Sequence, residues 1–167
     1  MAMDRDDVIS VLNDLIATSE DGVKDFRACA DAVKSSDAKT FFNDRVHLIE
    51  RGLKELQGEV RRLGGDPKAH GTARGAMRRG VIDIESAIKR KDDGAVLSEC
   101  TRAENAAVEH YQSALEKNLP PEVRTIVERQ LQGVLENRDR IRTLRDTIPG
   151  AHPGAAREAD RGTPPPM

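Results

Sequence analysis

The feature that most constrains this chain is the spacing of its apolar residues, which recur every three or four positions through four long stretches. This spacing gathers them on one side of an α-helix, whereas a half-buried strand would show strict alternation. With no Trp, one Tyr and three Phe, the core must be built from Leu, Val, Ile and Ala, which favours helices over strands. We therefore predict an all-α fold with long helices at about 5–34, 37–63, 94–118 and 121–148.

The breaks between these stretches predict how the helices connect. Residues 35–37, Ser-Ser-Asp, leave almost no linker between the first two helices, which is typical of an antiparallel helix pair. Residues 64–67, Gly-Gly-Asp-Pro, end the second helix, and Pro121 suits the first turn of the last one. A shorter helix at about 73–90 would lie in the connection between the two pairs. The sequence thus predicts two hairpins joined by a crossover.

The rest of the composition bounds the domain organisation and the partners. Residues 1–148 form one predicted bundle domain, and residues 149–167 are rich in Pro and Gly without an apolar period, which predicts a disordered tail. A net charge of −2 argues against a dedicated nucleic-acid-binding protein. The acidic N-terminus has no apolar signal segment and no stretch is long enough to span a membrane, so we expect a cytoplasmic protein without membrane contact.

Glu104 breaks the apolar pattern of the third long helix. It falls within that helix's apolar side, which is formed by Val96, Leu97, Cys100, Ala103, Ala107, Tyr111, Ala114 and Leu115. A carboxylate in such a place must be paired, protonated or bound to a cation, because an unpaired buried charge costs several kcal/mol. The partner of Glu104 therefore decides between a metal site and a structural ion pair.

Three segments carry a resemblance to a known family: DVISVLNDLIATSEDGVKDF, ELQGEVRRLGGDP and ERQLQGVLENRDRIRTLRD. Together with the helix layout, they make the chain similar to an uncharacterised bacterial family of the ferritin-like superfamily over about residues 6–148. The resemblance implies an up-down-down-up four-helix bundle, with a short extra helix in the crossover connection. In the di-iron and di-manganese members of the superfamily, each hairpin contributes a carboxylate from one helix and a Glu-x-x-His from its partner.

Carried over to this sequence, most of that ligand set is missing. Glu20 projects beside the apolar side of its helix, and Glu50 is followed by Leu53 where the motif has His. Glu136 points away from the apolar side of the last helix, so Glu104 alone has a suitable orientation. We therefore expect no metal cofactor. The alternative is a di-iron or di-manganese oxidase or storage protein that uses Glu20, Glu50, Glu104 and Glu136.

Other polar residues on the inner sides of the predicted helices suggest how Glu104 is neutralised. Counting ~1.5 Å per residue along each helix brings Arg45 and Arg138 within roughly 10 Å of Glu104 along the bundle axis. Ser19 falls near the same level, and Gln130 also faces inward. We predict a buried polar cluster of Glu104, Arg45, Arg138, Gln130 and Ser19, in which guanidinium groups occupy the volume that metals would take.

These features favour a non-enzymatic protein that acts as an interaction or stress-related module. Ile16, Phe42 and Val46 lie at the edges of apolar sides and could contribute to a homodimer interface, so we expect a homodimer. Cys29 and Cys100 each lie on an apolar side, which predicts two reduced core cysteines; a disulfide or a reactive thiol is the alternative.

Overall fold

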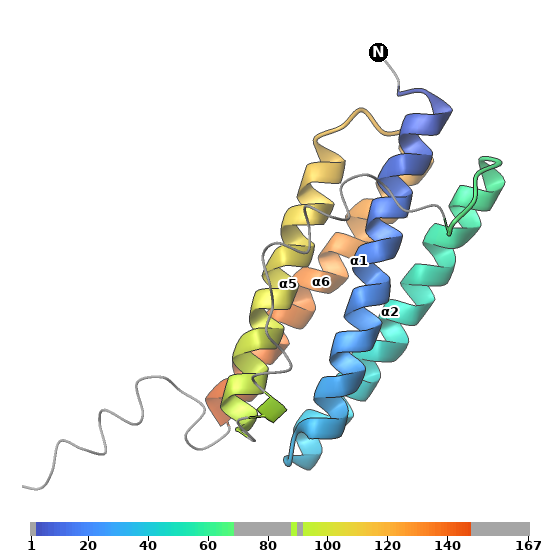
Figure 1. Ribbon diagram of the computed structural model, residues 1–167. Helices are drawn as coiled ribbons and strands as arrows, with labels where there is room; N and C mark the ends of the chain where they lie inside the picture. Colours follow the sequence, from blue (N-terminus) through green and yellow to red (C-terminus); the bar gives the residue numbers. More distant parts are fainter. Residues whose placement is uncertain (1–2, 69–87, 90–91, 148–167) are drawn as a thin grey trace, which may run out of the picture.

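In the part of the chain that the structure describes, four long helices run side by side (Figure 1). The computed structural model describes residues 3–68, 88–89 and 92–147. Its long helices are α1 (Arg5–Ala32), α2 (Ser36–Arg62), α5 (Asp93–Leu115) and α6 (Pro121–Thr147). The predicted tail at 149–167 lies outside the described residues, as does the predicted connector helix at 73–90 except for residues 88–89.

The order of the helices is up-down-down-up. The ends of α2 and α5 lie at the end of the bundle where α1 and α6 begin, so α2 and α5 run parallel to each other and antiparallel to α1 and α6 (Figure 1). The helices of each hairpin, α1 with α2 and α5 with α6, pack most closely. Between the hairpins, α1 packs on α5 and α2 packs on α6, which leaves α2 and α5 on a diagonal. The predicted all-α four-helix bundle is confirmed.

Local capping explains where the helices begin and end. The side chains of Asp4, Ser35 and Asp92 accept hydrogen bonds from backbone N–H groups at the starts of α1, α2 and α5, which satisfies donors that the first helical turn leaves free. Gly64, with φ of 82°, follows α2 in the left-handed conformation that favours glycine. Helix α5 ends at Leu115. Pro120 disfavours helical geometry at Leu119, so the chain does not continue as one helix into α6, which begins at Pro121.

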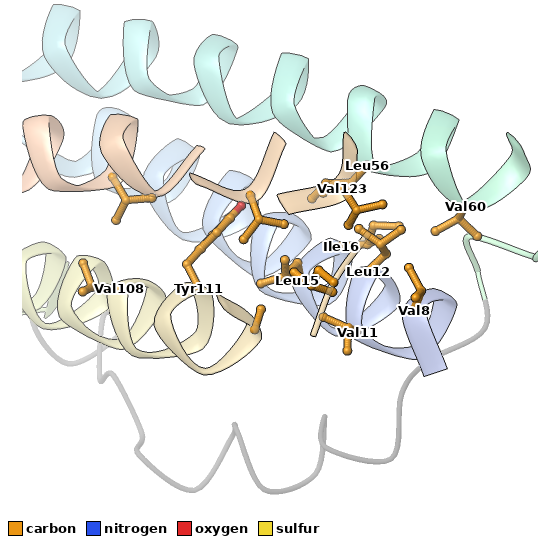
Figure 2. Packing of buried hydrophobic residues seen from close by; sticks show 14 residues of the cluster. Val8, Val11, Leu12, Leu15, Ile16, Leu56, Val60, Val108, Tyr111 and Val123 are labelled. Carbon is orange, nitrogen blue, oxygen red and sulfur yellow. The ribbon is translucent and has the colours of Figure 1, made fainter. Parts of the chain in front are cut away.

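The core consists of two apolar clusters, one toward each end of the bundle. The first cluster lies beside the N-terminal half of α1 and the C-terminal half of α2 (Figure 2). Its fully buried members include Val8, Leu12, Leu15, Leu56, Val60, Val123 and Val127. The second cluster lies beside the helix ends near the α1–α2 turn and includes Phe26, Cys29, Phe42, Leu97, Cys100 and Ile141. The level between the two clusters is where the polar residues of the interior gather.

The residues proposed for a dimer interface are part of this core. Ile16, Phe42 and Val46 are only 2%, 0% and 4% exposed, so they offer no surface to a second copy of the chain. The reason is that the bundle's own helices already cover them. The homodimer itself stays a prediction, now without that surface to support it. Among the described residues, no helix has the length and apolarity that a membrane span requires.

Candidate functional site

Glu104 lies in the interior of the bundle, at the level between the two apolar clusters. It projects from the middle of α5 and is 1% exposed. Cys100, one turn before it, belongs to the second cluster, and Val108, one turn after it, belongs to the first. The helical spacing that packs these neighbours in the core carries the Glu104 carboxylate inward with them.

Two side chains from other helices hydrogen-bond the Glu104 carboxylate. From α2, Arg45 donates its Nε to Oε1 over 3.1 Å and its Nη2 to Oε2 over 3.3 Å. From α6, Asn137 donates its Nδ2 to Oε1 over 3.0 Å. Arg45 is 8% exposed and Asn137 is 5% exposed, so the whole group lies in the interior of the bundle. The fork of the guanidinium matches the two carboxylate oxygens, which is the strongest geometry for such a pair.

The electrostatics of this buried acid combine two opposing effects. Burial raises the pKa of the Glu104 carboxyl above its ordinary value, because the charged form loses its hydration. The charge of Arg45 and the hydrogen bonds from Arg45 and Asn137 oppose that shift, with a further contribution from the charge of Arg138. The carboxylate therefore depends on its protein partners for neutralisation.

The other three residues of the predicted cluster, Arg138, Ser19 and Gln130, hydrogen-bond groups other than the Glu104 carboxylate. Arg138 donates its Nη1 to Asn105 Oδ1 over 3.3 Å and acts on Glu104 through its charge. Ser19 is buried and donates its hydroxyl to the Leu15 carbonyl over 2.9 Å. These contacts place Arg138 at the edge of the bundle rather than in its centre.

Gln130 belongs to a second polar group, about two helical turns along the bundle. Its Oε1 accepts a hydrogen bond from the Tyr111 hydroxyl over 2.8 Å, and its Nε2 donates to the Gly52 carbonyl over 3.1 Å and to Glu55 Oε1 over 3.0 Å. A side chain at position 52 would crowd the Gln130 amide, since a Cβ there would lie 3.3 Å from Nε2. Gly52 thus allows the close approach of α6 to α2 at this level.

Residues of both polar groups line a pocket of about 470 Å³ that involves all four helices. Arg45, Glu104, Tyr111 and Gln130 supply its polar wall. Its apolar wall is formed by Phe26, Leu48, Ile49, Ala103, Ala106, Ala107 and Val134. The small alanine side chains of α5 leave the space open, and a volume of this size suits a small organic molecule.

Charged residues of α1 border the same pocket. Asp21, Lys24 and Asp25 line it, and His110 of α5 is a further lining residue. Burial raises the pKa of the Asp25 carboxyl, and the charge of Asp21 raises it further. Two carboxylates against one ammonium group favour a neutral or cationic ligand over an anionic one.

The residues present do not fit a dimetal centre. Glu50 Oε1 pairs with Arg27 Nη2 at 2.6 Å on the outside of the bundle, Glu136 is exposed, and Glu20 is half-buried. The remaining candidate, Glu104, has both carboxylate oxygens bonded to Arg45. Within residues 3–68, 88–89 and 92–147, no three His, Cys, Asp or Glu side chains gather as a metal site would need.

Asn137 is the functional-site residue that the sequence analysis missed. It lies between Val134 and Ile141, both fully or nearly buried on the inner side of α6. The helical spacing from Val134 to Ile141 was a usable signal, because a residue at that position faces the core.

The comparisons with known proteins agree with this fold. A family model described as a domain of unknown function, DUF2383, matches residues 7–117. The chain belongs to the DUF2383 family. No curated protein matches it. Among solved structures, it is similar to a two-domain protein from Anabaena variabilis that contains DJ-1/ThiJ/PfpI-like and ferritin-like domains.

That similarity is one of fold. The TM-score is 0.70 at 12% sequence identity, with 99% of this chain covered. The DUF2383 chain spans 41% of the length of the Anabaena protein. A ferritin-like helical bundle is therefore shown for this DUF2383 protein, in agreement with the resemblance seen in the sequence.

Proposed function

We propose that this DUF2383 protein is a non-enzymatic ferritin-like module that acts by binding, with a Glu–Arg–Asn network in the place of a metal site. The observation that carries the proposal is the bidentate contact of Arg45 with Glu104 inside the bundle. The Arg45 guanidinium hydrogen-bonds both carboxylate oxygens of Glu104, which a metal ion would need as ligands. Its positive charge also repels a cation. We propose an interaction or stress-related role in a bacterial cytoplasm.

Elemental analysis tests the proposal. The full chain, purified without chelators, is analysed for iron and manganese before and after incubation with Fe(II) or Mn(II) under air. We expect far less than one metal per chain, no rapid oxygen consumption, and the same values for Glu104→Gln. About two tightly held metals per chain, lost in Glu104→Gln, would establish the alternative of a di-iron or di-manganese oxidase or storage protein.

The pocket favours a more specific form of this binding function. Its polar wall, apolar wall and acidic border match a small neutral or cationic molecule with an apolar body. We propose that the module binds such a molecule between α1 and α5, beside Glu104. Binding of a small molecule in this pocket is independent of whether the protein binds a metal ion elsewhere.

A neutral apolar dye, phenylnaphthylamine, serves as a probe of the pocket. We expect saturable binding with a rise in fluorescence, and an affinity at least about tenfold lower in Ala106→Phe, which fills the space. Gly58→Ala is the matched control, because position 58 is exposed with no neighbouring atom near an added Cβ. Equal affinities in Ala106→Phe and in the parent would mean that the dye binds elsewhere.

A further inference from the structure

The two cysteines, far apart in the sequence, meet in the core of the second apolar cluster. Cys29 lies near the end of α1 and Cys100 in the first half of α5, and both are 0% exposed. Their Sγ atoms are 3.1 Å apart, and both thiols are free. A disulfide bond would need these two atoms to approach by only about 1 Å more, since S–S bonds are close to 2.05 Å long.

Cys29 and Cys100 lie on helices of different hairpins, so a disulfide bond between them would connect the two halves of the bundle. Helix α1 pairs with α2 in the first hairpin, and α5 pairs with α6 in the second. The helices of different hairpins contact each other less than the helices within one hairpin do. A covalent bond here would join the first hairpin to the second. It would also restrict one side of the pocket, because Phe26 and Glu104, each about one turn from a cysteine, both line it.

We propose that Cys29 and Cys100 form a reversible disulfide that locks α1 to α5 when a peroxide oxidises the protein. One cysteine, as its thiolate, attacks an oxygen of hydrogen peroxide; the O–O bond breaks, and a sulfenic acid and hydroxide form. The hydroxide takes up the proton that the thiol released and becomes one water. The thiol of the other cysteine then attacks the sulfenic sulfur, the S–O bond breaks, and a second water leaves. Two electrons and two protons thus pass from the two thiols to the peroxide.

The surroundings of the pair set the rate of this chemistry. Burial raises the pKa of the Cys100 thiol well above its ordinary value, and the neighbouring Cys29 adds to the shift. Little thiolate is present at neutral pH, so the first attack is slow. Hydrogen peroxide is small enough to enter the pocket, which reaches within about one turn of each cysteine. Once one sulfur is oxidised, the second thiol is already in contact with it, so the disulfide forms faster than further oxidation.

Oxidation of the full chain tests this proposal directly. The reduced protein is treated with hydrogen peroxide, and its intact mass, free-thiol content and non-reducing gel mobility are followed over time. We expect both thiols to disappear together, with a mass loss of two hydrogen atoms and no covalent dimer. The melting temperature should rise by roughly 5–10 °C, because a bridge between distant residues restricts the unfolded chain, and dithiothreitol should reverse the rise.

Single substitutions separate a disulfide from independent oxidation of each thiol. Cys29→Ala and Cys100→Ala should each leave a sulfenic acid that dimedone captures, with no rise in melting temperature. The wild-type protein carries the test even if either variant fails to fold. Sulfinic acid in the wild-type protein, covalent dimers, or thiols that survive a day in excess peroxide would each overturn the proposal. None of these outcomes depends on whether the pocket binds a ligand.

Discussion

Arg45 on α2 and Glu104 on α5 meet across the diagonal of the bundle, with the guanidinium Nε 3.1 Å from one carboxylate oxygen and Nη2 3.3 Å from the other. Their helices belong to different hairpins and do not pack directly as neighbours do. The pair therefore links the two hairpins at one level of the bundle. A buried ion pair of this kind fixes the register of the elements that carry it more reliably than it adds stability.

Breaking the pair from one side should destabilise the protein strongly. We expect Glu104→Leu to lower the free energy of unfolding by about 3 kcal/mol, because Arg45 is left as an uncompensated buried charge. Urea-induced unfolding followed by circular dichroism measures the loss. An unchanged unfolding midpoint in Glu104→Leu would mean that the carboxylate is not neutralised by a buried partner.

Replacing both partners tests whether they act as a unit. The double variant Arg45→Met with Glu104→Leu should lose less stability than either single variant, since well-packed apolar side chains commonly replace a buried ion pair at little cost. Additive losses in the double variant would show that Arg45 and Glu104 do not interact energetically.

The helices of this protein are predictable from the sequence because their local signals agree. In α1, Val8, Leu12 and Leu15 occur at helical spacing and are all buried. Asp4 is the N-cap of α1, and Ser35 is the N-cap of α2. Glycine and proline positions then mark where α2 and α5 end. These signals are local, so a single sequence contains them.

The site is less predictable because it depends on which side chains meet across the bundle. Arg45 and Glu104 were both visible as polar residues on apolar sides, and the structure brings them together. Arg138 and Asn137 differ by one position, or about 100° around α6, and the structure turns Asn137 toward the carboxylate. The pocket leaves no signal in the sequence, because its space results from how the alanines of α5 pack against the neighbouring helices.

The amide of Asn137 should contribute to the same network. We expect Asn137→Leu to lower the free energy of unfolding by about 1–3 kcal/mol, since Glu104 Oε1 loses a buried donor. Asn105→Ala is the matched control, because Asn105 is an exposed asparagine that bonds Arg138, and its loss should stay within about 0.5 kcal/mol. Thermal and urea unfolding measure both. Equal effects of the two substitutions would argue against a role for the buried amide.

His110 should give the stability a dependence on pH. Burial lowers the pKa of His110 below its ordinary value of 6.5, despite opposing charges from Glu109 and Asp14. Below pH 6.5 the unfolded chain therefore binds a proton that the folded chain resists, so the free energy of unfolding falls as the pH drops through this region. We expect the melting temperature to fall more steeply from pH 7 to 5.5 in the parent than in His110→Gln. If the melting temperature changes with pH to the same extent in both proteins, His110 ionises as readily in the folded state as in the unfolded state.

Asp93 should hold the α1–α2 turn against the start of α5. Its carboxylate accepts hydrogen bonds from the backbone N–H of Lys34 and of Ser35, each with a shortest distance of 3.0 Å. These charge-assisted bonds satisfy two donors that the turn leaves free, so Asp93→Ala should lower the free energy of unfolding by about 1–3 kcal/mol. Hydrogen exchange at the Lys34 and Ser35 amides should accelerate in parallel. Asp37→Ala is the control, because Asp37 also lies in a first helical turn but is exposed. If Asp37→Ala lowers the free energy of unfolding as much as Asp93→Ala does, the stabilisation by Asp93 comes from the helix dipole and not from its hydrogen bonds to the turn.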